Sequence, residues 1–381
     1  MSEQFVPEIR VAGFDEPWAR AALGSVAQLN PDENIPDEFE YVDLASVVGT
    51  RVINHRTESR VTAPSRAQRL ARKDDIFYQT VRPYQKNNVV FGGASKPFVF
   101  SSGYAQIRTP CESGFLFAAM QRPEFVSQVI DRCTGTSFPA IAPSALGEVL
   151  VPVCRSGAEQ RSIAATFTNL DSTTSSHEQK RRQLKQAKAS LMQRMFPAPG
   201  ETEPEIRFEG FTGAWQERRL GAMASEFRSG DFIPAREIHL SGAYPVFGGN
   251  GKRGYTNVFN HAGLFVLIGR QGALCGNVRF SVGKAYFTEH AIAVKGNAEH
   301  DTRFLGYLFA TLNLGQYSAQ SAQPGLAVGS VREVKALAPS LAEQRAIGAF
   351  FSKLDDLIEA EAQYVSKLQQ VKSALLQKMF V

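Results

Sequence analysis

Cations and amides gather in one part of this sequence, between residues 56 and 87. Arginine and lysine bind phosphate oxygens and the O6 and N7 atoms of guanine, and asparagine and glutamine pair with adenine. A mixture of both kinds within one span is suited to a surface that follows a DNA backbone and reads base edges. The alternative is a solvated basic face followed by an ordinary loop. The candidate DNA contacts here are Arg56, Arg60, Arg72, Thr80, Arg82, Tyr84, Gln85, Lys86 and Asn87.

A second stretch, residues 248–255, places polar side chains among recurring glycines. The backbone freedom of glycine suits a loop that approaches a groove closely, and the alternative is a simple β-turn. A similar pair lies between Gly269 and Gly272 at the end of an apolar run. The loops at 134–138 and 318–325 are weaker candidates for phosphate contact. The candidate residues of the second stretch and of the pair are Asn250, Lys252, Arg253, Tyr255, Arg270 and Gln271.

Neither stretch has the spacing of a catalytic motif. Residues 248–254 do not form a P-loop, because Val246 stands where that motif needs glycine and Lys252 is followed by Arg253. The sequence has no G-x-S-x-G elbow, and its histidines and cysteines lack metal-ligand or nucleophile spacing. We therefore expect no catalytic residue, no metal and no bound cofactor in this chain.

Composition limits the class of protein without deciding its function. A chain of 381 residues that is 43% hydrophobic is long enough for two domains with real cores. The net charge of +5 permits a nucleic-acid partner but does not require one. The amino terminus lacks a signal-peptide core, and no run approaches the roughly 18 apolar residues of a membrane span. We expect a cytoplasmic protein whose four separated cysteines are reduced, namely Cys111, Cys133, Cys154 and Cys275.

Two internal repeats organise the chain. The first, Pro-Glu-Ile-Arg followed by Gly-Phe and Trp, begins at Pro7 and again at Pro204. The second, Ala-Glu-Gln-Arg, begins at Ala158 and again at Ala342, and it keeps an offset of 184 residues without a gap. The order is therefore lobe, helical element, lobe, helical element.

The second repeat predicts two long helices, over residues 158–196 and 342–380. Both stretches lack proline, contain almost no glycine, and are rich in Gln, Glu, Lys, Ala and Leu. Some 39 helical residues make a rod of roughly 58 Å. The first stretch is polar at residues 173–177, where we expect a kink or fraying.

Apolar residues of the second helix follow alternating steps of three and four, interrupted at Glu361, which indicates a coiled-coil seam. The predicted seam comprises Phe350, Leu354, Leu357, Tyr364, Leu368, Val371 and Leu375. Packing of helix against helix is expected from Ile163, Phe167, Leu170, Leu184, Leu191, Ile347, Phe351, Leu354, Leu368 and Leu375. The polar faces, including residues 180–182, 185, 359 and 361, are either solvated or available to partners.

The lobes differ in texture from the helices. Short β-rich runs at 88–91, 264–268 and 291–294 alternate with Gly and Asn clusters, and helices are expected near 115–133 and 301–314. The fold class is α+β, with two α/β lobes. The expected boundaries are a first lobe at 1–157, a first helix at 158–196, a Pro-rich linker and second lobe at 197–341, and a second helix at 342–381.

The whole duplicated order resembles the specificity subunits of type I restriction-modification systems. The resemblance rests on Ala-Glu-Gln-Arg leading into F-x-x-L-D at 167–171 and 351–355, and on the endings LMQRMF and LLQKMF. In the second lobe it rests on the runs at 244–251 and 268–272. One departure is Arg155, which stands where the second copy has Pro339 and leaves the start of the first helix undefined.

The resemblance implies two target-recognition domains at opposite ends of an antiparallel helical pair, with a pseudo-twofold internal repeat. Each domain would read one half of an asymmetric bipartite DNA site. Two modification (methyltransferase) subunits and the restriction subunits would dock on this chain, and those partners would carry S-adenosylmethionine, ATP and Mg. From the residues alone, a stand-alone coiled-coil scaffold with two ligand-binding lobes and an enzyme with an unfamiliar site stay open.

Overall fold

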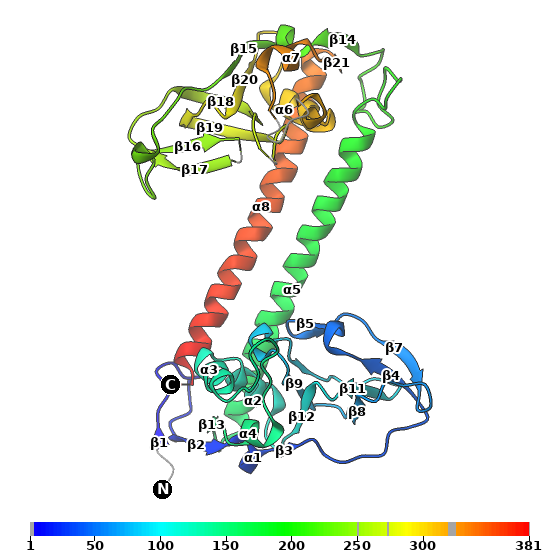
Figure 1. Cartoon of the computed structure of the whole chain (residues 1–381), viewed down its shortest axis with the longest axis vertical. Helices are drawn as coiled ribbons and strands as arrows, with labels where there is room; N and C mark the ends of the chain where they lie inside the picture. The colour runs from blue at the N-terminus through cyan, green and yellow to red at the C-terminus, as the bar shows by residue number, and fades with distance from the viewer. Residues whose placement is uncertain (1–3, 250, 273, 319–324, 381) are drawn as a thin grey trace. The chain divides into compact units, whose positions relative to one another are not determined.

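The structure is a computed structural model that describes residues 4–249, 251–272, 274–318 and 325–380. The chain divides into two units, one of Met1–His177 with Tyr364–Val381 and one of Glu178–Gln363. Each unit contains one lobe and half of each of the two long helices (Figure 1). Among the described residues no helix is long and apolar enough to cross a membrane.

The two long helices are α5 (Gly157–Arg194) and α8 (Leu341–Lys378), each of 38 residues. The sequence-based prediction is confirmed to within two residues at each end. Each helix has a glutamate in its first turn, Glu159 or Glu343, and a basic residue in its last turn, Arg194 or Lys378. These charges oppose the helix dipole and stabilise both ends.

The predicted fraying in α5 was wrong, since the helix is continuous through its polar middle. Hydroxyl groups there bond to carbonyls one turn earlier, from Thr174 to Leu170 at 2.7 Å and from Ser176 to Ser172 at 2.9 Å. The ring of His177 lies 4.3 Å from that of Tyr364 on α8. Short polar side chains therefore satisfy themselves along the helix surface, and the backbone ladder remains intact.

Within the first unit the helices pair antiparallel. From the start of α5 inward, Phe167 meets Phe380 with ring centroids 6.0 Å apart. One turn further along, Asp171 accepts from Nζ of Lys372 at 2.6 Å. Residue numbers rise along one helix while they fall along the other, which defines the direction.

The second unit repeats these contacts with the helices exchanged. Phe351 lies 6.2 Å from Phe196, Asp355 pairs with Lys188, and Glu361 pairs with Lys180 at 2.6 Å. Phe351 and Asp355 are the counterparts, 184 residues later, of the phenylalanine and aspartate that pair in the first unit. The repeat in sequence is therefore also a repeat of contacts.

The predicted seam of α8 was partly wrong. Leu357, Tyr364 and Val371 are 47%, 48% and 49% exposed, so none of them is buried between the helices, although the ring of Tyr364 lies against that of His177 on α5. Apolar residues occupy more than one face of α8, and their spacing alone does not show which face packs against the partner helix. Leu354, Leu368 and Leu375 are half-buried. The buried positions of α8 are Glu343, Gln344, Ile347, Gly348, Phe351, Glu361, Val365 and Leu376.

The other residues expected between the helices vary in burial. Ile163 and Phe167 are buried, in a core that also holds Leu376 of α8 and Phe380, which follows that helix. Leu170 and Leu191 are partly buried and pack against the cores of their own units. Leu184 is half-buried.

The first lobe combines small sheets with short helices. Its two four-stranded sheets have the orders β10-β9-β12-β3 and β7-β4-β11-β8. The rings of Phe77 on β9 and Phe100 on β11 stack at 3.7 Å and join the two sheets. The strands are β1 (Gln4–Phe5), β2 (Trp18–Ala22), β3 (Gln28–Leu29), β4 (Glu38–Val42), β5 (Val47–Val48), β6 (Arg51–Val52), β7 (Arg56–Ser59), β8 (Ala67–Leu70), β9 (Ile76–Gln79), β10 (Val89–Val90), β11 (Phe98–Ser101), β12 (Tyr104–Arg108) and β13 (Leu150–Val153). The helices are α1 (Leu23–Val26), α2 (Ser113–Met120), α3 (Pro123–Asp131) and α4 (Pro143–Gly147).

The second lobe is built on one six-stranded sheet of order β15-β20-β18-β19-β16-β17. Helix α6 packs on this sheet through Phe304 and Leu308, which share a core with Val266 and Ile292. The strands are β14 (Gln216–Arg219), β15 (Ala224–Ser229), β16 (Tyr244–Gly248), β17 (Gly251–Thr256), β18 (His261–Gly269), β19 (Val278–Phe287), β20 (Ala291–Gly296) and β21 (Lys335–Ala338), and the helices are α6 (Thr302–Thr311) and α7 (Val328–Glu333). Both lobes therefore combine β-sheet with short helices, but their sheet topologies differ.

The two sequence repeats meet in the structure and form a clasp around the helix ends. In the first unit Arg10 donates to both carboxylate oxygens of Glu159, from Nε at 2.7 Å and from Nη2 at 2.9 Å. Ile9 N–H donates to the last-turn carbonyl of Lys378 at 3.0 Å, and Glu8 pairs with the Lys378 side chain. One short segment thus joins the start of α5 to the end of α8.

The second unit contains the same clasp. Arg207 donates to Glu343 at 2.7 and 2.8 Å, which fixes the start of α8. Ile206 N–H donates to the carbonyl of Arg194 at 2.9 Å, and Glu205 pairs with the Arg194 side chain at 2.6 Å. Because a helix end leaves several carbonyls without partners inside the helix, this segment also caps α5.

Glu159 is fully buried, so its charge depends on its partners. Burial raises the pKa of this carboxyl, but hydrogen bonds from Arg10, Cys154 and Trp18 outweigh that effect and leave the pKa below its ordinary value. Removing one partner of a buried pair leaves an uncompensated charge.

Arg10→Ala is expected to lower the free energy of unfolding by about 3–5 kcal/mol, because Glu159 loses its main counter-charge. Denaturant unfolding of the purified chain measures the change. Arg132→Ala, which removes an exposed arginine from the same lobe, serves as the control and should stay within about 0.5 kcal/mol of the parent. Equal stabilities of the two variants would contradict the role of the clasp.

The clasp also predicts a pH dependence. The pKa of Glu159 is depressed in the folded chain, so its stabilisation is present above the unfolded value of about 4.3 and is lost as the pH falls through the folded pKa. The gap in unfolding free energy between the parent and Arg10→Ala should therefore narrow below about pH 4. If this difference in unfolding free energy stayed constant from pH 7 to pH 3, the stabilisation by Arg10 would not depend on the charge of Glu159.

Candidate nucleic-acid interface

Hydrogen bonds of buried amide side chains fix the loop over residues 80–88 of the first lobe. Nε2 of Gln79, on β9, donates to the carbonyl of Val81 at 2.7 Å and to Oε1 of Gln85 at 2.9 Å. The side chain of Asn88 accepts from Gln79 N–H at 2.7 Å, and that of Asn87 accepts from Gly49 N–H at 3.0 Å. The loop is therefore a fixed platform, although it contains no regular strand.

Two residues of this loop have left-handed backbones without being glycine. Arg82 has φ +55° and Lys86 has φ +57°, on either side of a short 3-10 turn. Such a conformation costs an L-residue about 1–2 kcal/mol, so the surrounding hydrogen bonds must stabilise it. Strain of this kind is found where a side chain has to be aimed.

The structure separates the first group of candidates by accessibility. Tyr84, Gln85 and Lys86 are exposed on the 80–88 loop. Thr80 is buried and donates its hydroxyl hydrogen to the carbonyl of Gly103 at 2.8 Å, so it supports the loop and does not face a groove. The side-chain oxygen of Asn87 is likewise used within the lobe.

Acidic neighbours compete for two of the three arginines that precede the loop. Arg56 pairs with Glu58 at 2.7 Å and with Asp43 at 3.1 Å. Arg72 pairs with Glu33 at 2.6 Å. Arg60 is exposed and has no ion-pair partner among the described residues. Arg60 is therefore the better placed of the three for a phosphate.

In the second lobe, β17 brings three candidates to the edge of the large sheet. Lys252, Arg253 and Tyr255 lie on this last strand, which pairs with β16. Nζ of Lys252 lies 4.6 Å from the ring centre of Tyr255 and donates to its hydroxyl at 2.9 Å. Asn250, like most of the loop at 318–325, lies outside the described residues. This edge combines an exposed cation with an aromatic ring.

Arg270 is a structural brace and not an exposed reader. Its Nε donates to the carbonyl of Leu326 at 3.1 Å, and its Nη1 donates to that of Glu289 at 3.3 Å. Gln271 beside it is exposed and forms a β-bridge with Gly325. The glycines around this pair predicted a loop correctly, but the direction of the arginine depends on carbonyls far away in the sequence.

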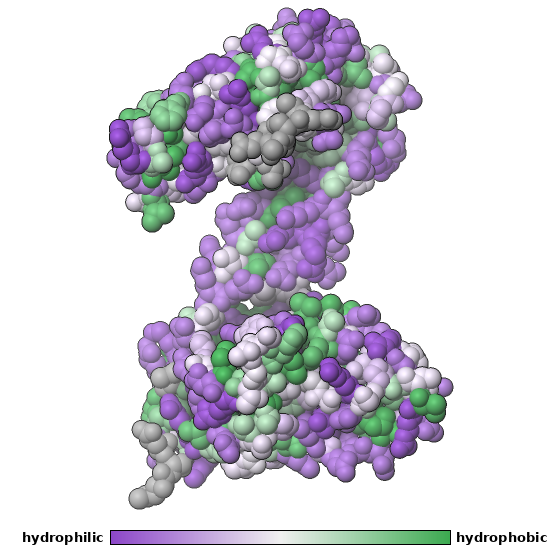
Figure 2. Space-filling view, viewed as in Figure 1, coloured by the Kyte–Doolittle hydropathy of each residue, from purple (hydrophilic) through white to green (hydrophobic). Residues whose placement is uncertain are grey.

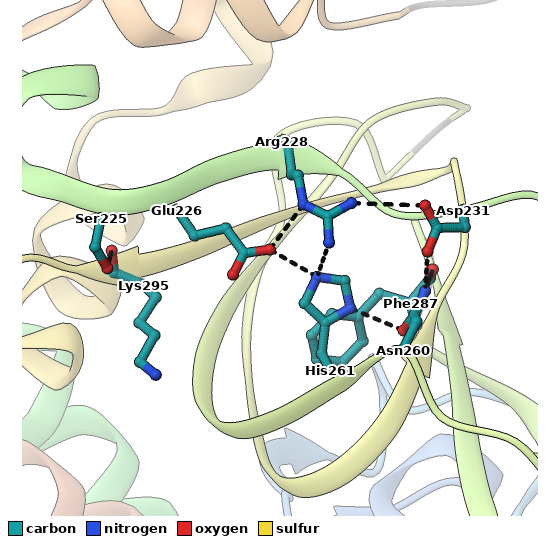
Figure 3. A network of polar contacts seen from close by, with 8 residues as sticks. All are labelled: Ser225, Glu226, Arg228, Asp231, Asn260, His261, Phe287 and Lys295. Atoms are coloured by element: carbon teal, nitrogen blue, oxygen red, sulfur yellow. Dashed lines mark hydrogen bonds and ion pairs between the residues drawn. The ribbon is translucent and has the colours of Figure 1, made fainter.

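A polar network in the second lobe was not predicted from the sequence (Figure 3). Nδ1 of the buried His261 lies 2.8 Å from Oδ1 of Asn260, and Nε2 lies 2.9 Å from Oε1 of Glu226 and 3.3 Å from Nη2 of Arg228. Arg228 also donates to Glu226 and pairs with Asp231 at 3.5 Å. Burial lowers the pKa of His261, and the neighbouring Glu226 carboxylate acts in the opposite direction. The network ties β15 to β18 and stabilises the sheet.

The comparison with protein families finds a match in the second half of the chain. Residues 213–370 match the model of the type I restriction modification DNA specificity domain. Over 153 residues the chain is 41% identical to the type I restriction enzyme EcoprrI specificity subunit of Escherichia coli. Over 113 residues it is 26% identical to the putative type I restriction enzyme specificity subunit S.HindORF215P of Haemophilus influenzae.

These matches cover part of the proteins involved. The first alignment spans 39% of this chain and 37% of the Escherichia coli protein. The second spans 29% of each. The chain thus aligns with about a third of the length of these curated relatives.

Solved structures share the fold over nearly the whole chain. The crystal structure of a type I restriction-modification S subunit from M. genitalium superposes with a TM-score of 0.72, at 18% identity, over 99% of both chains. A chain from a structure of type I R-M complex assembly gives a TM-score of 0.54 at 21% identity, over 95% of this chain and 97% of that one. At these identities the likeness establishes the α+β fold with two lobes and paired long helices.

Proposed function

We propose that the whole chain is the DNA-reading subunit of a type I restriction-modification system, because residues 213–370 match the model of the type I restriction modification DNA specificity domain. The observation that carries the proposal is the duplication, in which each of two clasped helix pairs holds one lobe with exposed cations and amides. Each lobe reads one half of a bipartite target, and the helices set the spacing between the halves.

The two half-sites differ because the two lobes differ. The first lobe presents an amide-supported loop with Arg82, Tyr84 and Lys86, whereas the second presents a sheet edge with Lys252 and Arg253. Direct readout depends on which donors reach which base edges. Two unlike surfaces therefore read two unlike sequences, which makes the whole target asymmetric.

Catalysis belongs to partner subunits in this proposal. We assign the metal-dependent steps to those partner chains. Modification subunits supply S-adenosylmethionine and methylate adenine, and restriction subunits supply ATP, Mg and cleavage. Because its partners act on DNA, the chain works in the cytoplasm.

We assign the exposed apolar positions of α8 in the first unit to a modification subunit. Tyr364 and Val371 lie seven residues apart and are each about half exposed. Figure 2 shows hydrophobic patches along this helix among hydrophilic neighbours. Apolar side chains at this spacing suit packing by a second amphipathic helix.

Co-expression with an adenine methyltransferase tests the proposed function. The purified complex is expected to methylate one split DNA sequence, which methylome sequencing of the host identifies. Exchange of residues 29–150 for another lobe should change one half of that sequence only, and insertion of helix turns into α5 and α8 should change the gap. A chain that forms no complex and directs no methylation would instead be a stand-alone binding scaffold.

Lys86→Ala and Lys252→Ala are expected to weaken binding to all sequences by a similar factor and to reduce the salt slope of binding by about one. The reason is the loss of one phosphate contact in each variant. Titration of target and non-target duplexes at several salt concentrations measures both effects. Lys96→Ala is the control, because Lys96 pairs with Glu40 at 3.2 Å within the lobe. A selective loss for the target alone would reassign these lysines to base contacts.

A further inference from the structure

Arg82 and Phe138 lie against each other although 56 residues separate them in the sequence. The guanidinium carbon of Arg82 is 4.3 Å from the ring centre of Phe138. We propose that Arg82 reads a guanine in the half-site of the first lobe and that Phe138 is the positioning residue that aims it. This inference rests on the proposed function and adds a base identity and a residue pair to it.

The backbone fixes the two residues relative to each other. Val81 and Ala140 form an antiparallel bridge, and Arg82 N–H donates to the carbonyl of Pro139 at 2.7 Å. Ile141 N–H donates to the carbonyl of Thr80 at 3.0 Å. The two segments are thus locked in register directly beside the pair, so the stacking does not depend on the side chains alone.

The loop that carries Phe138 is closed on itself. Thr134 and Ala140 exchange both backbone hydrogen bonds at 2.9 Å. Gly135 has φ +88°, and a Cβ there would lie 3.2 Å from the carbonyl oxygen of Phe138. The turn is therefore built for glycine and holds Phe138 at its tip.

Phe138 is 63% exposed, which is unusual for a phenylalanine held this firmly. The Phe138 ring lies beneath the Arg82 guanidinium, and the Arg82 side chain is half-buried, so it keeps some access to solvent. Guanine presents O6 and N7 side by side in the major groove, which matches two donors of one guanidinium edge. Restricting the arginine beforehand lowers the entropy that binding has to overcome.

Arg82 has no carboxylate as an ion-pair partner among the described residues, in contrast to Arg56 and Arg72. Its left-handed backbone, φ +55°, is maintained by the hydrogen bonds of Gln79 beneath the loop. An arginine that is strained, stacked and without a counter-charge is arranged for an acceptor outside the chain.

The experiment compares methylation by the complete complex with its methyltransferase partner. Substrates are the target duplex and a series with each base pair of the first-lobe half-site changed singly, and kcat/KM is measured for every one. The variants are Arg82→Ala, Arg82→Lys, Phe138→Ala and Phe138→Tyr. Arg20→Ala is the matched control, because Arg20 is an exposed arginine of the same unit placed 5.0 Å over the ring of Phe5.

Arg82→Ala should lose about 5- to 100-fold of discrimination at one G·C position and keep discrimination elsewhere. Arg82→Lys should restore it only in part, because an ammonium lacks the rigid planar fork with which a guanidinium donates to O6 and N7. Phe138→Ala should weaken discrimination at the same position, and Phe138→Tyr, which keeps the ring, should restore it. Arg20→Ala should leave every ratio unchanged.

The inference is overturned if Arg82→Ala leaves unchanged every ratio of kcat/KM between the target and a changed duplex. It is likewise overturned if the variant slows methylation of all substrates equally. It is also overturned if Phe138→Ala affects a different position from Arg82→Ala. Absence of sequence-specific methylation by the parent complex would refute the proposed function itself, which is a separate outcome.

Discussion

The buried carboxylate at the start of each long helix sets the conditions for the rest of this molecule. Glu159 and Glu343 are almost fully buried, and each is held by an arginine from a segment more than 130 residues earlier in the chain. The same segments cap the end of the other helix through a backbone N–H. Because the charge of each glutamate is tolerable only with its arginine in place, the start of one helix, the end of the other and the connecting segment form together or not at all.

The clasp explains why polar side chains lie where a coiled-coil seam was expected to be apolar. With the helix ends fixed, the register between the helices follows, and it places Asp171 opposite Lys372 and Asp355 opposite Lys188. These pairs are partly exposed, and their opposite charges favour one direction and register of the helices. Leu357 and Val371 of α8 are left about half exposed.

The lobes show a different balance between rigidity and exposure. In the 80–88 loop, buried amides and two left-handed residues fix a surface that remains accessible. In the second lobe the accessible surface is the sheet edge at β17, and the His261 network connects β15 to β18 in the same sheet. The helices and their clasps therefore repeat between the two halves of the chain, whereas the lobes differ in sheet topology.

The sequence by itself determined the two helices, their repeat, the division into lobes and the general location of cationic loops, because period, helix propensity and glycine content are local properties. It did not reveal that the motifs at Pro7 and Ala158 contact each other, since a contact between distant segments has no local signature. Only the tertiary structure decided which apolar row of α8 is buried, that Thr80 and Arg270 serve the fold, and that Phe138 stands beneath Arg82. Each of these depends on which carbonyl, carboxylate or ring the folded chain brings within a few ångströms.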